Sequence, residues 1–268
     1  MGIVNVTPDS FSDGGEFLET DAAVAHGLDL VGEGADILDI GGESTRPGAD
    51  PVSEQEELRR VIPVIEGLTA AGTTAQISID TSKAKVAAAA LGAGASLVND
   101  VSAFRVDPGM AGMVADSGAE CCLMHMLGEP RTMQRDPRYD DVVDEVKAFL
   151  AQRMSFAVRE GVSEERIMLD PGIGFGKTAA HNLELIDRLA ELAELGRPIV
   201  IGTSRKSFLG RIAADAAGLA EPLDAQHRLA GTIATNVLAL ERGAEVFRVH
   251  DVAPVREALA VAAATLGN

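Results

Sequence analysis

The chain has 268 residues, of which 46% are apolar and 24% charged, and its formal net charge at pH 7 is -18. This composition is typical of a soluble globular protein and excludes a disordered or collagen-like chain. The acidic balance argues against binding to nucleic acid or to an anionic membrane surface. No run of about 18 uncharged apolar residues is present that would span a membrane. If the substrate carries phosphate, the few bases must be concentrated at one place.

The N-terminal sequence lacks the basic and then apolar pattern of a secretory signal. The chain has two cysteines, Cys121 and Cys122, which are neighbours. A disulfide between adjacent residues would be strained, so we expect both to be reduced and buried in the core. These features predict a cytoplasmic protein.

Short β-rich apolar runs alternate with Ala- and Leu-rich segments of helical period. The predicted strands are Ile3–Val6, Ile37–Ile40, Ala75–Ile79, Ser96–Asn99, Cys121–Met124, Ile167–Leu169, Ile199–Ile201 and Val246–Val249. The predicted helices are Asp21–Gly32, Ser53–Ala70, Lys83–Leu91, Gly109–Ser117, Tyr139–Glu160, His181–Leu195, Asp224–Arg242 and Pro254–Leu266. Thr20 or Asp21 is the expected N-cap of the first helix, and Ser53 with Glu56 forms a capping box for the second.

Strands that alternate with helices predict βαβ units and a parallel sheet. The strand count and the 268 residues suit an α/β protein with a single (β/α)8 TIM barrel, which typically has about 250 residues. An open doubly wound sheet is the alternative, because periodicity does not show whether a sheet closes. We find no linker-like or low-complexity tract and therefore treat residues 1–268 as one domain.

Every predicted strand ends in a polar or charged group, at the edge where a TIM barrel carries its active site. These groups are residues 5–7, 39–46, Asp80, Asn99 with Asp100, His125, Asp170, residues 204–206, and Arg248 with His250. Asp80 and Asp170 directly follow apolar runs, so we expect them to be partly buried and to need hydrogen-bond donors. The N–H and NH2 edge of a nitrogen heterocycle would supply two. Alternatively, Asp80 caps a helix that begins near Ser82.

The bases gather after the last two strands, where this fold most often binds phosphate. Arg205 and Lys206 follow the seventh strand, and Arg248 and His250 follow the eighth. Arg248 and His250 are two positions apart and so lie on one side of an extended segment, unless they form a solvated loop pair. Arg46 could fold over the same place. We expect the surplus acid on outer helices, as in residues 54–57 and 140–145.

The segment Asp170–Thr178 ends in Gly-Lys-Thr but is not a P-loop, because Pro171 stands where the pattern needs its first glycine. Its alternating glycines either let backbone approach a flat ligand or form a tight turn. The five histidines show no spacing of transition-metal ligands. A Mg²⁺ ion at a phosphate needs only one or two protein oxygens, and Asn5 could supply one.

Taken together, these segments resemble the dihydropteroate synthase family. The matching motifs are MGIVNVTPDSFSDGG (1–15), DIGGESTRPG (39–48), SIDT (78–81), NDVS (99–102), MH (124–125), TMQ (132–134), DPGIGFGK (170–177), SRKSFLG (204–210) and RVHDV (248–252). The resemblance implies a TIM barrel that joins 6-hydroxymethyl-7,8-dihydropterin diphosphate to 4-aminobenzoate by an SN1-like displacement. It further implies assistance by Mg²⁺, inhibition by sulfonamides and a homodimer, for which the Ala-rich helices near residues 224–266 could supply an apolar face.

The resemblance also implies roles for particular residues. The groups that would take part in catalysis are Asp80, Asp13, Lys206, Arg248 and His250, and Asn5 would hold the metal. The substrate-binding set adds Asn99, Asp170, Thr45, Arg46, Pro47, Phe11, Phe175, Ser207, Met124 and Gly202. Within this set, the carboxylate of 4-aminobenzoate would reach Ser207 at the start of a helix. The remaining alternatives are a pterin-binding methyltransferase barrel that serves a corrinoid protein and a catalytically silent pterin-binding paralogue.

Overall fold

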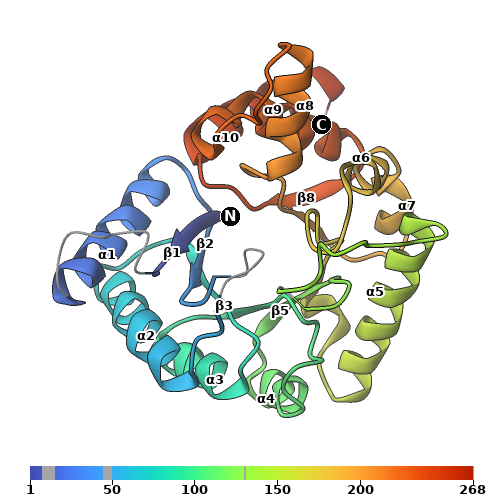
Figure 1. Ribbon diagram of the computed structural model, residues 1–268. Coiled ribbons are helices and arrows are strands. Elements are labelled where there is room, and N and C mark those ends of the chain that lie inside the picture. Colours follow the sequence, from blue (N-terminus) through green and yellow to red (C-terminus); the bar gives the residue numbers. More distant parts are fainter. Residues whose placement is uncertain (8–15, 45–49, 130, 268) are drawn as a thin grey trace.

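The structure is a computed structural model that describes residues 1–7, 16–44, 50–129 and 131–267, with the backbone alone for 16–19. An eight-stranded parallel sheet follows the order of the chain and is curled (Figure 1). Its strands are β1 (Gly2–Asn5), β2 (Ile37–Gly41), β3 (Gln76–Asp80), β4 (Leu97–Asp100), β5 (Glu120–Met124), β6 (Ile167–Asp170), β7 (Ile199–Ile201) and β8 (Ala244–Phe247). Each predicted strand is therefore confirmed, and its bounds shift by at most two residues.

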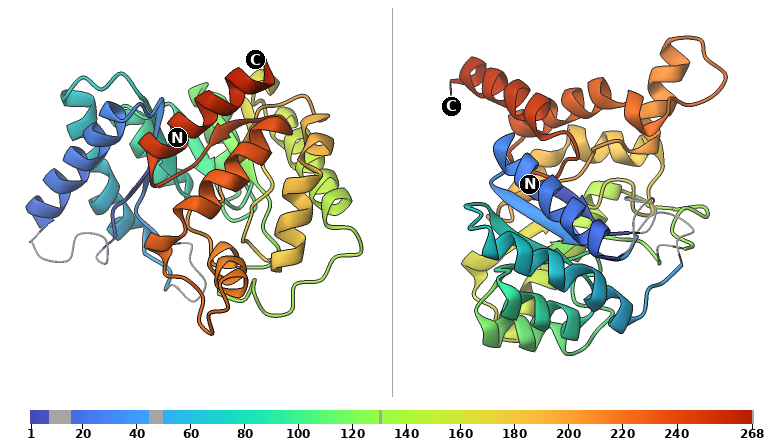
Figure 2. Two further views of the ribbon diagram at one scale, coloured as in Figure 1. Left: turned by 90° about the horizontal axis from the view of Figure 1, so that it is seen from above. Right: turned by 90° about the vertical axis from the view of Figure 1, so that its left-hand side faces the viewer.

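Helices cover the outside of the curled sheet, because parallel strands need crossover connections and each helix buries one stripe against the sheet. They are α1 (Glu16–Gly32), α2 (Glu54–Ala70), α3 (Ala84–Ala93), α4 (Met110–Ser117), α5 (Val142–Arg159), α6 (Ala179–Asp187), α7 (Leu189–Ala193), α8 (Ser207–Ala216), α9 (Leu229–Glu241) and α10 (Val252–Leu266). Two 3-10 turns, η1 (Glu164–Arg166) and η2 (Ala225–His227), complete the described elements. The last two helices, α9 and α10, pack side by side (Figure 2).

Four helix predictions differ from the structure. The helix predicted over 224–242 begins only at Leu229, and residues 225–227 form the 3-10 turn η2. α1 begins at Glu16, so neither Thr20 nor Asp21 is its N-cap. The helix predicted over 181–195 is broken at Arg188, whose backbone is not helical, with φ -102° and ψ 23°. The set of predicted helices did not include α8, although one face of this helix is apolar and buried. Burial of Phe208 and Leu209 holds this helix in place.

Ser53 is the N-cap of α2 as predicted, and its side chain accepts a hydrogen bond from the backbone N–H of Glu56 at 3.2 Å. The carboxylate of Glu56, which would complete the predicted capping box, binds the guanidinium groups of Arg59 and Arg60. None of the described helices is both long and apolar enough to cross a membrane.

Two apolar clusters lie on opposite faces of the sheet. The larger one fills the space between the sheet and the helices, and the smaller one lies inside the curl, with Met1, Leu97, Cys122, Met168 and Val200 as its buried members. Cys121 belongs to the larger cluster and Cys122 to the smaller one, as the alternation of side chains along a strand requires. Both cysteines are free and buried, as predicted, and burial raises the pKa of Cys121 to about 12.

The segment after β8 returns to the first strand. Gly2 and Val249 form a parallel bridge. The backbone N–H of Ile3 donates to the carbonyl of Val249 at 3.0 Å, and the N–H of Val249 donates to the carbonyl of Met1 at 2.9 Å. These bonds place Arg248 and His250, the two residues that flank Val249, beside β1.

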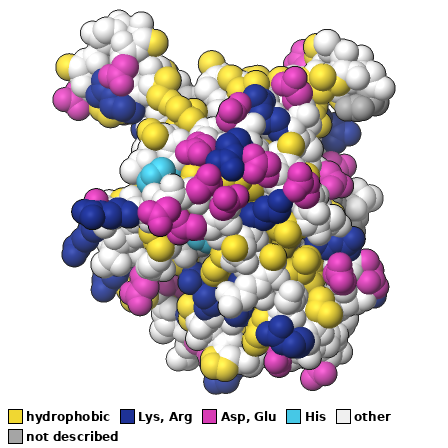
Figure 3. Space-filling view, turned by 90° about the vertical axis from the view of Figure 1, so that its right-hand side faces the viewer, with side chains coloured by type: hydrophobic (Ala, Val, Ile, Leu, Met, Phe, Trp, Pro, Cys, Tyr) yellow, Lys and Arg dark blue, Asp and Glu magenta, His cyan; other side chains and the backbone are white. Residues whose placement is uncertain are grey.

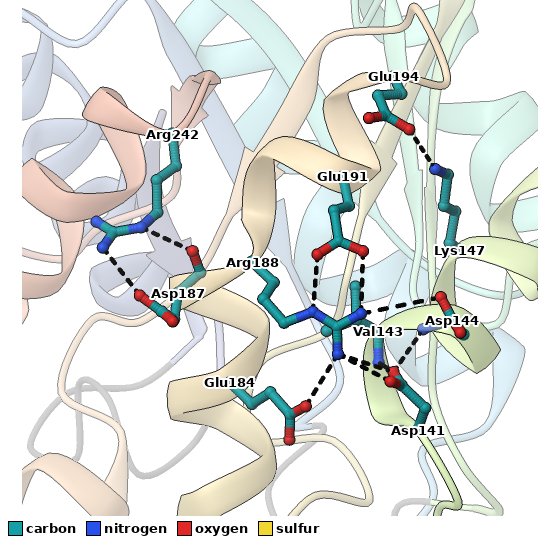
Figure 4. Close-up of polar contacts among 10 residues, drawn as sticks. All are labelled: Asp141, Val143, Asp144, Lys147, Glu184, Asp187, Arg188, Glu191, Glu194 and Arg242. Atoms are coloured by element: carbon teal, nitrogen blue, oxygen red, sulfur yellow. Dashed lines mark hydrogen bonds and ion pairs between the residues drawn. The ribbon is translucent and has the colours of Figure 1, made fainter.

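Acidic and basic side chains are interleaved on the outer face formed by α5, α6 and α7 (Figure 3). At its centre the guanidinium group of Arg188 lies among carboxylates of α6, α7 and the start of α5 (Figure 4), with contacts of 2.9 Å to Asp141, 3.0 Å to Glu184 and 2.7 Å to Glu191. Exposed pairs of this kind contribute little stability each. The acidic side chains of this network lie on an outer surface, as the sequence predicts.

Glu57 contradicts that prediction, because its side chain is fully buried, although the sequence places it among the solvated acids of residues 54–57. Its Oε2 lies 2.5 Å from the ammonium group of Lys83, which also contacts Glu43. A buried carboxylate needs such a partner. The pattern of charges along α2 did not show it, since Lys83 lies on another element.

Candidate active site

One row of side chains lies inside the curled sheet at the carboxyl ends of its strands. In the strand register Asn5 pairs with Gly41, Gly41 with Asp80, and Asp80 with Asn99. On the other strands, the smaller cluster and its neighbour Val246 show which side chains point inside the curl. Because side chains alternate along a strand, the residue two positions further along points inside as well. These residues are Met124, Asp170, Gly202 and Arg248. Asn99 pairs in register with Cys122 and Met124 with Asp170, so the seven residues that the sequence singled out form, together with Gly41, a band on the inner face at the carboxyl ends of the strands, called the row below.

Asp39 lies one step deeper and is fully buried. Its carboxylate accepts hydrogen bonds from Ser78 Oγ at 2.6 Å, Asn99 Nδ2 at 3.0 Å and Arg248 Nε at 2.6 Å. From the sequence, Asp39 was predicted only as the start of a polar strand end, and its central position was missed. The available signal was a charged residue within an apolar run, where a carboxylate is stable only with several donors.

Arg248 joins two of the acidic strands of the site, β2 and β3. While its Nε donates to Asp39, its Nη2 donates to Asp80 Oδ2 at 2.8 Å. Burial lowers the pKa of Arg248, but the charges of Asp39 and Asp80 outweigh it and the net shift is upward, so the guanidinium stays charged. Arg248 is therefore not part of a solvated loop pair.

Burial raises the pKa of Asp80 to about 7, an effect that Arg248 opposes and Asp39 reinforces. Asp80 does not cap the following helix, because α3 begins at Ala84 and its N-cap is Lys83. The row therefore holds a carboxylate whose protonation changes near neutral pH.

His250 connects the ends of β7 and β8. Its Nδ1 lies 2.9 Å from Ser204 Oγ, and its backbone N–H donates to the same oxygen at 3.1 Å. Arg205, which the sequence places among the bases of the mouth, instead forms an ion pair with Asp251 through Nε at 3.0 Å and Nη2 at 2.6 Å. Its charge is compensated there, so among the described residues the positive charge near the row comes from Lys206, Arg248 and Lys177.

Lys206 is the N-cap of α8, which begins at Ser207 as expected. Its ammonium nitrogen lies 4.1 Å from the centre of the Phe175 ring, a favourable cation–π distance. Burial and the nearby charge of Arg248 lower the pKa of Lys206 to about 8, while Asp170 and Asp80 oppose this shift. Ser207 is exposed beside this pair, at the helix end where backbone N–H groups attract an anion.

The turn after β6 is tightly packed against protein. Asp170 Oδ1 accepts the N–H of Gly172 at 2.6 Å. Gly172, Gly174 and Gly176 have φ values of 68°, 82° and 66°, in the left-handed region. A Cβ on Gly172 would lie 1.9 Å from the carbonyl oxygen of His125. At Gly172 the missing side chain therefore serves a tight turn and a close backbone contact, which was the alternative reading of this motif.

We expect Gly172→Ala to lower the free energy of unfolding by more than about 3 kcal/mol, because the new methyl group would overlap the His125 carbonyl. Gly196→Ala is the matched control, since Gly196 has a similar φ of 71° and an added Cβ would meet nothing within 4 Å. That variant should lose only about 1 kcal/mol, the cost of the left-handed backbone. Urea denaturation of both variants measures the difference, and equal losses would contradict the contact argument.

Five residues of the predicted site lie outside the described part of the chain. They are Phe11, Asp13, Thr45, Arg46 and Pro47. Their assignment stays a prediction.

Within the described residues, no cluster of three or more His, Cys, Asp or Glu side chains could hold a metal ion. A Cβ placed on Gly41 would lie 3.7 Å from Asp80 Oδ2, which Arg248 already binds, and 3.8 Å from Asn5 Oδ1, so Asn5 offers the oxygen that no described cationic side chain holds at this spot. Amide and carboxylate oxygens are the ligands that Mg²⁺ prefers, and Mg²⁺ commonly uses only one or two from protein beside phosphate and water. The residues present therefore fit a weakly held Mg²⁺ that a phosphate ligand completes.

Comparison with known proteins agrees with this geometry. The family model described as pterin binding enzyme matches residues 1–250. Dihydropteroate synthase from Escherichia coli (strain K12) is 44% identical over 266 residues, which cover 99% of this chain and 91% of that protein. The solved structure of Xanthomonas albilineans dihydropteroate synthase with 4-aminobenzoic acid superimposes with a TM-score of 0.91 at 50% identity, covering 100% of this chain and 93% of that one.

A second solved structure, the Yersinia pestis dihydropteroate synthase with a sulfonamide drug complex, has a TM-score of 0.91 at 43% identity and covers 100% of this chain and 94% of that one. The fold and the family model define a pterin-binding α/β enzyme. More narrowly, the chain belongs to the dihydropteroate synthase family.

Proposed function

We propose that this chain joins 6-hydroxymethyl-7,8-dihydropterin diphosphate to 4-aminobenzoate and releases 7,8-dihydropteroate and diphosphate. The observation that carries the proposal is the row of acids and amides, with Arg248 bound to Asp39 and Asp80, in a chain whose relatives are dihydropteroate synthases over nearly their whole length. A transfer of this type needs a site for a flat nitrogen heterocycle beside a site for a leaving diphosphate.

The pterin ring suits the polar row. The carboxylates of Asp80 and Asp170 can accept hydrogen bonds from its N–H and NH2 groups. Asn99 donates to Asp39 through Nδ2, so its Oδ1 is oriented to accept from the ring. A side chain on Gly202 would meet nothing within 4 Å, which leaves open space in the row for a planar molecule. Met124, buried at the end of β5, supplies an apolar contact.

The diphosphate suits the bases that follow β8. Arg248 is charged and offers planar donors to phosphate oxygens, and His250 follows two residues later. Asn5 Oδ1 would hold the Mg²⁺, which when bound would neutralise charge on the departing diphosphate. As the bond between the methylene carbon and the diphosphate oxygen breaks, Arg248 stabilises the negative charge of the leaving group.

The 4-aminobenzoate suits the wall formed by Phe175 and Lys206. Its ring would stack near Phe175, and its carboxylate would meet Ser207 and the first N–H groups of α8. The neutral arylamine then attacks the methylene carbon and loses its proton late, so no strong base is required. Asp80 stabilises the cationic pterin before attack, and we keep Asp13, Phe11, Thr45, Arg46 and Pro47 as predicted loop residues that exclude water.

The wider architecture follows the same proposal. We infer that the sheet closes into a single TIM barrel and that residues 1–268 form one domain. The bridge between Gly2 and Val249 supports closure. We also infer a homodimer through α9 and α10, where Leu238, Val261 and Leu266 are large apolar side chains exposed by 41%, 64% and 44%.

A coupled assay of diphosphate release tests the function directly. We expect release only when both substrates are present, with stimulation by Mg²⁺, and we expect a sulfonamide to inhibit competitively against 4-aminobenzoate. Methyl transfer from methyltetrahydrofolate would instead support a corrinoid-linked methyltransferase. Pterin binding without any product would support a silent paralogue.

A further inference from the structure

Lys177 carries an ammonium group that the proposed reaction does not use. Its side chain is only 3% exposed. Its Nζ lies 2.8 Å from His125 Nδ1, 3.0 Å from the carbonyl oxygen of Gly172 and 3.1 Å from the carbonyl oxygen of Phe175. Burial lowers the pKa of Lys177 to about 7, while the charge of Asp170 opposes the shift. The three acceptors favour the protonated form, because each of its three hydrogens has one acceptor here.

His125 is suited to act as one of these acceptors. Burial and the nearby charge of Lys177 lower the pKa of His125 to about 2, so its ring is neutral and Nδ1 can carry a lone pair. The ring is held edge-on against Phe149, with 4.8 Å between the ring centres. His125, directly after β5, is therefore a rigid support for the ammonium group, and the sequence placed it among the polar strand ends.

The carbonyls that Lys177 binds belong to the turn that carries Phe175. The left-handed glycines of this turn have more conformational freedom than any other residue, so they give it little rigidity of their own. Other side chains hold its remaining polar groups. Tyr139 Oη donates to the carbonyl of Gly176 at 2.8 Å, and the N–H of Gly174 donates to Asn182 Oδ1 at 2.7 Å.

The position of this turn decides where the aromatic wall of the site stands. Phe175 lies under the ammonium group of Lys206. A Cβ on Gly174 would lie 3.0 Å from Lys206 Cδ, so the turn and Lys206 are in close contact. A displaced turn would move Phe175 away from Lys206 and widen the space between the two.

We propose that Lys177 is a positioning residue, whose buried ammonium holds the Gly172–Phe175 turn so that Phe175 and Lys206 form the aminobenzoate wall. Lys177 itself touches neither substrate. This role rests on the proposed function, because it assigns 4-aminobenzoate to that wall. It concerns mainly one substrate, since Asp80 and Asn99, proposed for the pterin ring, and Arg248, proposed for the diphosphate, lie on other strands. Of the proposed pterin contacts, Asp170 alone binds the turn directly, through the N–H of Gly172.

Lys177→Met tests the role, because methionine has a similar length and no donors. We expect the KM for 4-aminobenzoate to rise about tenfold, the effect of losing charge-assisted hydrogen bonds that position the turn. The KM for the dihydropterin diphosphate should stay within about twofold, because only Asp170 among its proposed contacts is hydrogen-bonded to the turn, and Asp170 is held in place by β6. The matched control is Lys147→Met, which removes an ammonium that pairs with Glu194 on the outer face and should leave both constants unchanged.

A double-mutant cycle with Phe175→Leu distinguishes positioning from a general loss of structure. If Lys177 acts through Phe175, Lys177→Met adds little to the KM for 4-aminobenzoate once Phe175 is replaced. Additive effects, an unchanged KM or an equal rise in both KM values would each overturn the proposal. If Lys177→Met does not fold, Lys177→Gln keeps two donors and should show the same selectivity with a smaller rise, and equal rises in both KM values there would overturn it too.

The two proposals fail in different ways. A wild-type chain that forms no dihydropteroate contradicts the proposed function. An active wild-type chain whose Lys177→Met variant is fully active contradicts only the role of Lys177.

Discussion

Asp80→Asn should remove most of the turnover while the chain keeps its fold. The amide retains an oxygen that can accept, but it loses the charge that would stabilise a cationic pterin and presents an NH2 group toward ring donors. We expect kcat/KM to fall by roughly 10² to 10³, the usual effect of removing one electrostatic group from a catalytic site. Measured dihydropteroate formation near the wild-type rate would contradict the role of Asp80.

The pH dependence of pterin binding is a second test of the role of Asp80. Because burial raises the pKa of Asp80 to about 7, its carboxylate is largely protonated below that pH and accepts poorly. The affinity for 6-hydroxymethylpterin, which carries no diphosphate, should therefore increase as the pH rises from about 6 to about 8, and Asp80→Asn should abolish the increase. Asp187→Asn, which alters an outer acid paired with Arg242, should retain both the activity and the pH dependence.

Arg248→Met should weaken both the site and the fold. The variant loses the proposed donor to diphosphate, so the KM for the dihydropterin diphosphate should rise. It also leaves Asp39 and Asp80 without their shared cation. Removing one partner of a buried ion pair typically costs about 3–5 kcal/mol, and urea denaturation measures that loss.

The stability deficit of Arg248→Met should depend on pH in a defined direction. Arg248 lowers the pKa of Asp80. Its loss therefore raises the pKa of Asp80 in the folded state still further above the unfolded value of about 3.9. The folded state then binds more protons than the unfolded state, and stability falls as the pH rises through that window. We expect a larger deficit at pH 8 than at pH 5. A deficit that shrinks at pH 8 would contradict this sign.

Arg242→Met is the matched control for Arg248→Met. Arg242 pairs with Asp187 on the outer face, where the side chain of Asp187 is 73% exposed. Exposed pairs of this kind contribute about 1 kcal/mol or less. We therefore expect little change in stability and none in KM.

The net charge of -18 does not exclude a negatively charged substrate. The Arg188 network keeps acidic groups on the outer helices (Figure 4). Lys206 and Arg248 face the inside of the sheet. An acidic chain can therefore present positive groups to a diphosphate and a benzoate, because solvent screens the outer charges far more than buried ones.

The sequence alone determined the alternation of strands and helices and the row of residues at the strand ends. Both depend on local periodicity together with one geometric rule, that parallel strands present their carboxyl ends at the same edge. Asn5, Asp80, Asn99 and Asp170 could therefore be placed at one mouth before any contact was known.

Only the tertiary structure decided which charges pair. Arg248 binds Asp39 across 209 positions of sequence, Arg205 binds Asp251 instead of facing the site, and Glu57 is buried beside Lys83. Lys177 likewise became visible as a support for the Phe175 turn only through its contacts. The physical reason is that periodicity reports the face on which a side chain lies, whereas pairing depends on distances between elements that only the assembled fold sets.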